Sequence, residues 1–322
     1  MFRPLRIVPH GTKVPFVANR HKAFAFSVFL MLLSLGALVV NGLNFGIDFR
    51  GGILMEIKTP EPADIESLRT QLGSLDLGDV SIQEFGKVDD VLIRIQRQDG
   101  TEAEQLNAVE RVKETLGEGV EYRRTEFVGP TVGEELKEAG LIAVICALTA
   151  IMIYIWFRFE WQFGVCALIA LSHDVLSTLG LFALNGHEFN LPTVAAILTI
   201  AGYSINDTVV VFDRVRENFR KYKKMTFADL FNLSINETLS RTTMTSVTTM
   251  LALLAIYFFG GAVLADFALA MIWGVVIGTY SSIFIAVPLL LYLQPRRGED
   301  EDHDSPVQMP EYERQGAADK KD

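Results

Sequence analysis

Apolar residues in this chain gather into long runs, unlike the short mixed stretches of a soluble domain. Six runs approach the length of about 20 residues that a helix needs to cross the hydrocarbon core of a bilayer. They lie at residues 23–40, 139–157, 163–184, 191–212, 244–264 and 267–293. Because lipid offers no partners for backbone N–H and C=O groups, each run is predicted to form a transmembrane helix. Only the neighbourhood of Asp266 separates the last two runs.

The first run is predicted to remain as an uncleaved anchor. Its apolar stretch is longer than the hydrophobic region of a typical signal peptide, and no site of the A-x-A kind precedes Asn41 and Gly42. It therefore counts as the first of six spans.

Between the first and second runs the pattern changes to that of a small α+β domain. Stretches with strand character lie at 52–58, 80–85, 91–96 and 120–128, and helical spacing occurs at 64–72 and 102–116. Residues 87–90 predict the turn between the second and third strands. The order β-α-β-β-α-β is that of a ferredoxin-like domain. The expected fold is therefore an α-helical membrane protein with an inserted ferredoxin-like domain.

Basic residues favour one orientation in the membrane. Before the first run stand Arg3, Arg6, Lys13, Arg20 and Lys22. Between the fourth and fifth runs stand Arg214, Arg216, Arg220, Lys221, Lys223, Lys224 and Arg241, and Arg296 and Arg297 follow the sixth. Short basic loops stay in the cytoplasm, so both termini are predicted to be cytoplasmic.

The predicted domains follow from spans and orientation together. They are a cytoplasmic N-terminal segment (1–22), the first span (23–42), a periplasmic ferredoxin-like domain (43–138), a five-helix transmembrane bundle (139–294) and a disordered acidic cytoplasmic tail (295–322).

Composition narrows the classes of function. Half of the 322 residues are hydrophobic, and the net charge is −10. Residues 43–138 hold 21 acids against 11 bases, which argues against nucleic acid as a partner. The two cysteines, Cys146 and Cys166, lie inside the second and third runs and are expected to be buried apolar thiols. No catalytic, nucleotide-binding or metal-binding signature is present, so we expect neither an enzyme nor a cofactor or metal site.

The densest signal lies in the fourth run, in the string GYSINDTVVVFDR. An aspartate within hydrocarbon is costly and usually faces a partner or a wet cavity. Asp207 is therefore predicted to be functional, as a carboxyl that gains and loses a proton, with Asn206 as a secondary candidate. Asp213 stands nearer the interface, where a solvated helix end beside Arg214 and Arg216 is the favoured explanation, so Asp213 is kept as a secondary candidate.

The fifth run opens with SRTTMTSVTT. Arg241, Thr245 and Thr248 share one face by helical spacing. A line of hydroxyls leading from an arginine could guide water or bond a neighbouring helix. Alternatively, Arg241 anchors the span at the interface and the threonines bond back to their own helix.

Polar residues also occur in the third run and before the first strand. His173 and Asp174 lie near the middle of the third run, where a proton relay and a hydrogen-bonded brace between helices both remain open. The junction FGIDFRGG carries Gly46, Asp48, Arg50, Gly51 and Gly52. Its glycines permit tight turns, Asp48 and Arg50 could pair or cap, and the segment is predicted to act as a hinge.

Together these strings resemble the SecD/SecF family of protein-export membrane proteins, and within it the smaller partner, SecF. The resemblance rests on FGIDFRGG, LSHD, GYSINDTVVVFDRVREN, NETLSRTTMTS and GTYSSIFIA. It implies the fold of the resistance-nodulation-division superfamily, a bacterial inner membrane, a SecD partner, contact with the SecYEG channel, and use of the proton-motive force on preproteins. It also implies proton conduction at Asp207 and Arg241.

Two other classes of function compete with this interpretation. A small-molecule or lipid exporter of the same superfamily usually carries twelve spans and two large exported domains, which this chain lacks. A passive membrane scaffold would have no use for an aspartate at the depth of Asp207.

Overall fold

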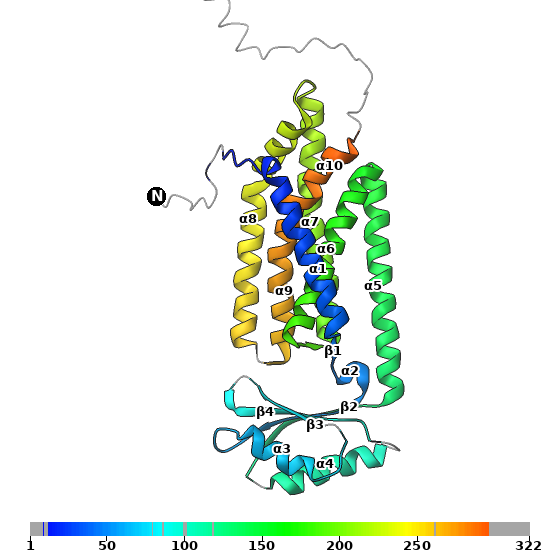
Figure 1. The fold of residues 1–322 in the computed structure, drawn as a ribbon, viewed down its shortest axis with the longest axis vertical. Helices are drawn as coiled ribbons and strands as arrows, with labels where there is room; N and C mark the ends of the chain where they lie inside the picture. Colours follow the sequence, from blue (N-terminus) through cyan, green and yellow to red (C-terminus); the bar gives the residue numbers. More distant parts are fainter. Residues whose placement is uncertain are drawn as a thin grey trace, which may run out of the picture.

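A computed structural model describes residues 9, 12–78, 80–85, 87–98, 102–117, 119–260 and 262–295. Long helices run side by side, and a smaller α/β head lies at one end of them (Figure 1). Apart from Pro295, the predicted acidic tail lies outside the described residues, as do residues 1–8, 10 and 11 of the N-terminal segment.

Six helical segments among the described residues are long and apolar enough to cross a membrane, as the hydropathy pattern predicts. The helices are α1 (Arg20–Val40), α5 (Pro130–Arg158), α6 (Trp161–Asn185), α7 (Leu191–Lys221), α8 (Phe227–Phe259) and α9 (Ala262–Ser281). A short turn η1 (Val17–Asn19) precedes α1. The last segment continues from α9 through one π-helical turn, η2 (Ser282–Ala286), into α10 (Val287–Leu293).

The boundaries of the fourth and fifth spans differ from the prediction. The expected basic loop between them is mostly helical, because α7 runs to Lys221 and α8 already begins at Phe227. Apolar packing explains the extension, since Phe219 of α7 lies 5.8 Å from Phe231 of α8 between ring centroids. Thr226 starts α8 by accepting a hydrogen bond from the Asp229 N–H. The two helices therefore form a hairpin longer than a bilayer requires.

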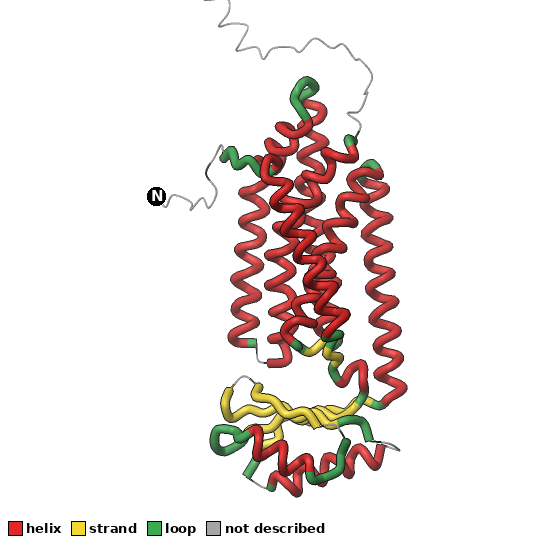
Figure 2. The backbone as a smooth tube through the Cα atoms, in the orientation of Figure 1, coloured by secondary structure: helices red, strands yellow, loops and turns green. Residues whose placement is uncertain are grey.

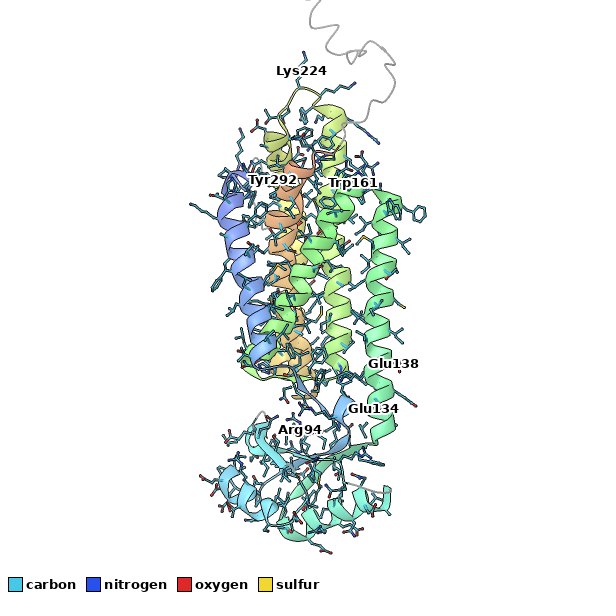
Figure 3. The ribbon with its side chains drawn as sticks, turned by 45° about the vertical axis from the view of Figure 1, so that its right-hand side comes forward. Arg94, Glu134, Glu138, Trp161, Lys224 and Tyr292 are labelled. Atoms are coloured by element: carbon cyan, nitrogen blue, oxygen red, sulfur yellow. The ribbon has the colours of Figure 1, made fainter. Side chains whose placement is uncertain are left out.

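This hairpin extends past the residues that mark a membrane edge. Trp161 and Tyr292 are both more than half exposed and lie at a similar level below Lys224 at the hairpin tip (Figure 3). Exposed Trp and Tyr favour the interface of a bilayer. The tip of the hairpin therefore stands beyond this interface, at the end of the molecule where α1 begins.

The helices differ sharply in how much neighbouring protein covers them. In their apolar windows, 56% of α6 and 50% of α7 is buried, against 6% of α5 and 11% of α8. The interior is thus built by α6, α7 and the α9–α10 segment, while α5 and α8 lie at the periphery. The two cysteines follow this division: Cys166 on α6 is buried, but Cys146 on α5 is exposed, which corrects the expectation of two buried thiols.

The head has the predicted order of strands and helices. Its elements are β2 (Gly52–Lys58), α3 (Ile65–Gly73), β3 (Val80–Phe85), β4 (Lys87–Ile95), α4 (Glu102–Leu116) and β5 (Glu121–Val128). The strands form one antiparallel sheet in the order β3-β4-β2-β5. Residues 87–90, predicted to be a turn, instead open β4, where Lys87 pairs with Phe85 and Asp90 pairs with Lys58.

The two head helices cover one face of this sheet, and the other face looks toward the bundle (Figure 2). Alternate residues of each strand explain the difference. Ile53, Met55 and Ile57 of β2 are fully buried beneath the helices, whereas Glu56 of β2 and Arg94 of β4 belong to the opposite face. The face of the sheet that lies next to the helix ends therefore carries charged residues, together with Leu54 and Leu92, which pack on Ile47.

The junction between α1 and the head is held firmly by the bundle. Its strand β1 (Asn44–Phe45) pairs in parallel with β6 (Glu188–Phe189), which connects α6 to α7. The short helix α2 (Ile47–Arg50) packs against α5, where a Cβ on Gly133 would lie 3.3 Å from the Phe49 carbonyl oxygen. Much of the predicted hinge is thus part of the bundle, and only its end at Gly51 and Gly52, with φ of +72° and +129°, leads into the head.

Candidate functional site

Asp207 lies close to the midpoint of α7 and is nearly inaccessible, with 3% of its surface exposed. The helix α7 continues past residue 212, the predicted end of its span, to Lys221, so the middle of the helix falls near Asp207. Its Oδ2 has no hydrogen-bond partner anywhere in the described part of the chain. A buried carboxyl with one oxygen that accepts no hydrogen bond can take up a proton without breaking an existing hydrogen bond.

The polar groups that act on this carboxyl come from α8. They are the charge of Arg241 and the hydroxyl of Thr245. The Thr245 hydroxyl donates to the Thr242 carbonyl of its own helix at 2.9 Å. Arg241 is exposed and lies well inside α8, not at the start of a helix as expected. Asp207 of α7 thus lies within the electrostatic influence of Arg241 of α8.

Thr248 does not belong to this group. Its side chain is exposed, and its hydroxyl donates to the Met244 carbonyl at 2.8 Å. The predicted file of hydroxyls thus stops at Thr245, because helical backbone carbonyls satisfy both threonines. Thr242 is the residue that the sequence analysis missed on this helix: it is 1% exposed, and its hydroxyl oxygen has no partner among the described residues.

Asp174 forms the second polar centre, at the meeting point of three helices. It is fully buried on α6, and its Oδ2 accepts hydrogen bonds from Ser204 of α7 at 2.6 Å and from Ser281 of α9 at 2.7 Å. Its Oδ1 lies 3.0 Å from Nδ1 of His173, which is also buried. Ser204 and Asp207 are one helical turn apart, so the position of Asp174 bears directly on that of Asp207.

A further hydroxyl pair fixes α7 to the π-helical turn. Thr208 of α7 and Ser282 of η2 lie 2.8 Å apart between their hydroxyl oxygens, and both are buried. A single π-helical turn within a helix often marks a functional position. Sequence analysis singled out none of the three serines (Ser204, Ser281, Ser282), although small hydroxyl residues repeated in apolar helices indicate interhelical hydrogen bonds.

The two secondary candidates lie away from the interior. Asn206 is exposed on the outer face of α7. Asp213 forms an ion pair with Arg158 at the end of α5, at 2.7 Å, and both side chains are more than two-fifths exposed. Asp213 thus joins two helix ends near the surface, a role close to the solvated helix end considered from the sequence.

The junction residues mainly bond the segment between α1 and the head to the bundle. Asp48 accepts a hydrogen bond from the Leu191 N–H at 2.9 Å, so it caps α7 and does not pair with Arg50, which is exposed. The Gly46 N–H donates to the Phe189 carbonyl at 2.9 Å. Within the described residues no cluster of three or more His, Cys, Asp or Glu side chains could hold a metal ion.

Comparison with known proteins relates this chain to one family of membrane proteins. A family model for the C-terminal region of the protein export membrane proteins SecD and SecF matches residues 108–296, and one for the SecD/SecF GG motif matches residues 36–59. The protein translocase subunit SecF of Rickettsia bellii is 45% identical over 300 residues, which covers 92% of this chain and 98% of the relative. This chain belongs to the SecF family.

A second SecF relative and two solved structures extend the comparison. SecF of Cereibacter sphaeroides is 47% identical over 303 residues, covering 91% of this chain and 94% of the relative. The crystal structure of SecDF from Thermus thermophilus, a translocon-associated membrane protein, matches with a TM-score of 0.81 and 38% identity, covering 91% of this chain but only 40% of that one. SecDF in a super-membrane-facing form matches with a TM-score of 0.67 and 37% identity over 92% of this chain and 40% of that one.

As a member of the SecF family, this chain is a protein translocase subunit with several membrane-spanning helices. The C-terminal family match covers Asp174, Asp207 and Arg241, and the GG-motif match covers Gly51 and Gly52. The polar centres of the bundle thus lie inside the part of the chain that the family shares.

Proposed function

We propose that this SecF-family chain uses the proton-motive force to promote movement of preproteins through the SecYEG channel, together with a SecD partner. It acts as a mechanical subunit and not as an enzyme. The observation that carries the proposal is Asp207, a buried carboxyl in the middle of a spanning helix with a vacant oxygen and with Arg241 on the neighbouring helix. Small-molecule export, the alternative considered from sequence, has no observation in its favour.

The proposed mechanism alternates the environment of Asp207. An ionised carboxylate within the membrane requires a nearby cation, which Arg241 supplies when α7 and α8 are close. When α8 moves away, the carboxylate loses this support and binds a proton. Proton passage and helix movement are then linked, since each state of Asp207 favours a different position of α8. The low burial of the apolar part of α8 is consistent with this mobility, because most of that surface is not covered by other described parts of the chain.

Asp174 is proposed to position α7 and not to carry the proton itself. Its two oxygens already interact with Ser204, Ser281 and His173. Such a network holds α6, α7 and α9 in one register while α8 moves. Because Ser204 lies one turn from Asp207, this network fixes the carboxyl in place. His173 is proposed to support the network through Asp174.

The exposed surface of the bundle supports a SecD partner. On α7 the residues Ala195, Thr199, Gly202 and Asn206 are exposed in the middle of a helix that is otherwise half buried. Small and polar residues of this kind let two membrane helices approach closely. Transporters built from two related halves bind their coupling ions between those halves. We therefore propose that SecD packs on this face, beside Asp207, with lipid surrounding the remainder.

The orientation and the domain assignments complete the proposal. We propose that residues 1–22 and 295–322 lie in the cytoplasm, residues 23–42 and 139–294 in the inner membrane, and residues 43–138 in the periplasm as a ferredoxin-like domain. The basic hairpin tip at Lys224 and the start of α1 share one end of the molecule, and the head lies at the other (Figures 1 and 3). The antiparallel sheet order β3-β4-β2-β5 supports the ferredoxin-like assignment.

Export from membranes that lack the chromosomal SecF tests the function. Inverted vesicles carrying this chain with its SecD are supplied with a preprotein and ATP, with and without a proton gradient. We expect the gradient to accelerate preprotein uptake only in vesicles that contain this chain. An equal response to the gradient in vesicles without it would contradict the proposed function, and a failure of SecD to co-purify would contradict the partner.

A further inference from the structure

Besides Asp207, the neighbouring helix α8 carries a buried polar atom without a partner. The hydroxyl oxygen of Thr242 has no hydrogen-bond partner among the described residues, and Thr242 is 1% exposed. The Oδ2 of Asp207 on α7 is in the same condition, with 3% of that residue exposed. Buried polar groups are nearly always hydrogen-bonded, because an unsatisfied one destabilises the fold. Two such atoms on adjacent helices therefore require an explanation.

Thr242 differs from three other threonines of α8. The hydroxyls of Thr238, Thr245 and Thr248 donate to carbonyl oxygens three or four residues earlier in the same helix, at distances between 2.8 and 3.0 Å. This bond is the ordinary way in which a threonine inside a helix satisfies its hydroxyl. The Thr242 hydroxyl makes no such bond within the described chain, so both its proton and its lone pairs are available to another group.

Thr242 lies on the side of α8 that faces α7. Eight residues before it, Ser234 accepts a hydrogen bond from Asn218 of α7 at 2.9 Å, and four residues after it, Ser246 accepts one from Tyr203 of α7 at 3.4 Å. Residues spaced by four follow one another along the same side of a helix. Because contacts with α7 occur both before and after it, and Thr242 itself is buried, this residue lies in the contact between the two helices.

Thr242 also stands at the level of Asp207. The helices α7 and α8 are antiparallel, and each rises about 1.5 Å per residue. Asp207 follows Tyr203 by four residues, and Thr242 precedes Ser246 by four, so both residues stand one helical turn along from the same interhelical bond. The two unpartnered atoms thus occur at one level of the contact between α7 and α8.

The cation and the hydroxyl near Asp207 come from different sides of α8. Arg241 is exposed, whereas Thr242, the next residue, is buried. No direct hydrogen bond joins Thr242 to Asp207. A water molecule is the smallest group that the two atoms can share, and a buried water takes about two to four polar partners, of which the hydroxyl and Oδ2 provide two.

We propose that Thr242 is a positioning residue, which holds a water molecule against Oδ2 of Asp207, and that protons reach and leave the carboxyl through this water. A hydronium ion at the site gives one proton to the carboxylate, which leaves a neutral water and a neutral carboxyl, and ionisation reverses the step. The inference rests on the function proposed above for Asp207 and adds to it a defined point of proton entry, on the inner side of α8 and away from the Arg241 charge.

Infrared difference spectra of the reconstituted chain, recorded as the pH changes, test for the water. A bound water is identified by an O–H stretching band that shifts in water enriched in oxygen-18. We expect such a band to accompany the titration in wild type, to disappear in Thr242→Val, which keeps the shape but removes the hydroxyl, and to return in Thr242→Ser. Thr242→Ala, with less bulk, should give the same spectrum as Thr242→Val. Since the hydroxyl bonds to no described group, neither change removes a contact that joins the helices.

Thr238→Val is the matched control. It removes a buried hydroxyl from the same helix, but one that bonds to its own backbone, so the water band should remain. A wild-type spectrum without an oxygen-18-sensitive band, or a band that persists in Thr242→Val and Thr242→Ala, would overturn the proposal.

Preprotein export in inverted vesicles with SecD separates this proposal from the function on which it rests. Thr242→Val should reduce the response to the proton gradient several-fold, Thr242→Ser should restore most of it, and Thr238→Val should retain it. If Asp207→Asn keeps the gradient response, the function proposed for Asp207 fails. If Asp207→Asn loses the response while Thr242→Val behaves as wild type, only the role of Thr242 is overturned.

Discussion

Two aspartates of the bundle, Asp174 and Asp207, occupy very different sites although both are buried on neighbouring helices. Asp174 interacts through both oxygens with groups from α6, α7 and α9. Asp207 has an oxygen without a partner in the described structure and faces the sparsely packed helix α8. A carboxylate with a complete set of partners holds helices together, whereas one with an incomplete set can change its protonation state. We therefore assign bracing to Asp174 and proton exchange to Asp207.

The largest expected effect is on coupling, in Asp207→Asn. Asparagine keeps the size of the side chain and cannot titrate, so the acceleration of preprotein export by the proton gradient should be lost almost completely. Because no hydrogen bond to Oδ2 is broken, thermal stability and co-purification with SecD should match wild type. Preprotein export in inverted vesicles with and without the gradient measures the coupling, and thermal melting of the detergent-solubilised protein measures the stability. A retained gradient response would contradict the carrier role of Asp207.

Arg241→Met should come next, with a large loss of the gradient response. Methionine preserves much of the apolar length of the arginine but removes the cation that supports ionised Asp207. Since Arg241 is exposed, the variant should fold normally. A matched control is Arg158→Met, which removes an exposed arginine from the Asp213 ion pair and should retain most of the response. Equal losses in the two variants would remove the distinction between Arg241 and an ordinary interfacial arginine.

Asp174→Ala is expected to act first on stability. It leaves the hydroxyl of Ser204 without its acceptor and that of Ser281 with the Gly278 carbonyl alone, and an unsatisfied buried polar group costs about 1–3 kcal/mol. The melting temperature should therefore fall clearly, and Asp174→Asn, which retains one acceptor oxygen, should recover part of the loss. A normal melting temperature in Asp174→Ala together with a complete loss of coupling would instead favour a proton relay at Asp174.

The smallest effects separate the two threonines of α8. Thr245→Val removes a hydroxyl that acts on Asp207 and should reduce the gradient response a few-fold. Thr248→Val removes an exposed hydroxyl bonded only to its own helix and should leave the response unchanged. The same export assay measures both. A larger effect of Thr248→Val would restore the continuous file of hydroxyls that the sequence pattern suggests.

Sequence patterns predicted the elements better than their packing. Long apolar runs and strand alternation identify six spans and the order of the head elements, because burial in lipid or in a sheet imposes a local period. The length of α7 and α8 was missed, since Phe219 and Phe231 support a helical hairpin through contacts that hydropathy does not record. Likewise, helical spacing shows that Thr248 and Arg241 share one face of α8, but it does not show which neighbouring helix that face contacts.

The candidate site shows the same limit. A carboxyl at membrane depth stands out in sequence, so Asp207 and Asp174 were found, but their hydrogen-bond partners decide which one titrates. Those partners, Ser204 and Ser281, are common residue types and lie 30 and 107 positions from Asp174. The ion pair between Arg94 of β4 in the head and Glu188 of β6 in the bundle was missed for a similar reason. The two residues are 94 positions apart, and only the folded chain brings them together.

Infrared difference spectroscopy of the reconstituted protein tests the assignment of the two aspartates most directly. The absorbance of protonated carboxyl groups is recorded as the pH changes, for wild type, Asp207→Asn and Asp174→Asn. We expect a titrating band from a buried carboxyl in wild type and in Asp174→Asn, and its loss in Asp207→Asn. A band that persists in Asp207→Asn and disappears in Asp174→Asn would reverse the two roles and contradict the mechanism proposed for this bundle.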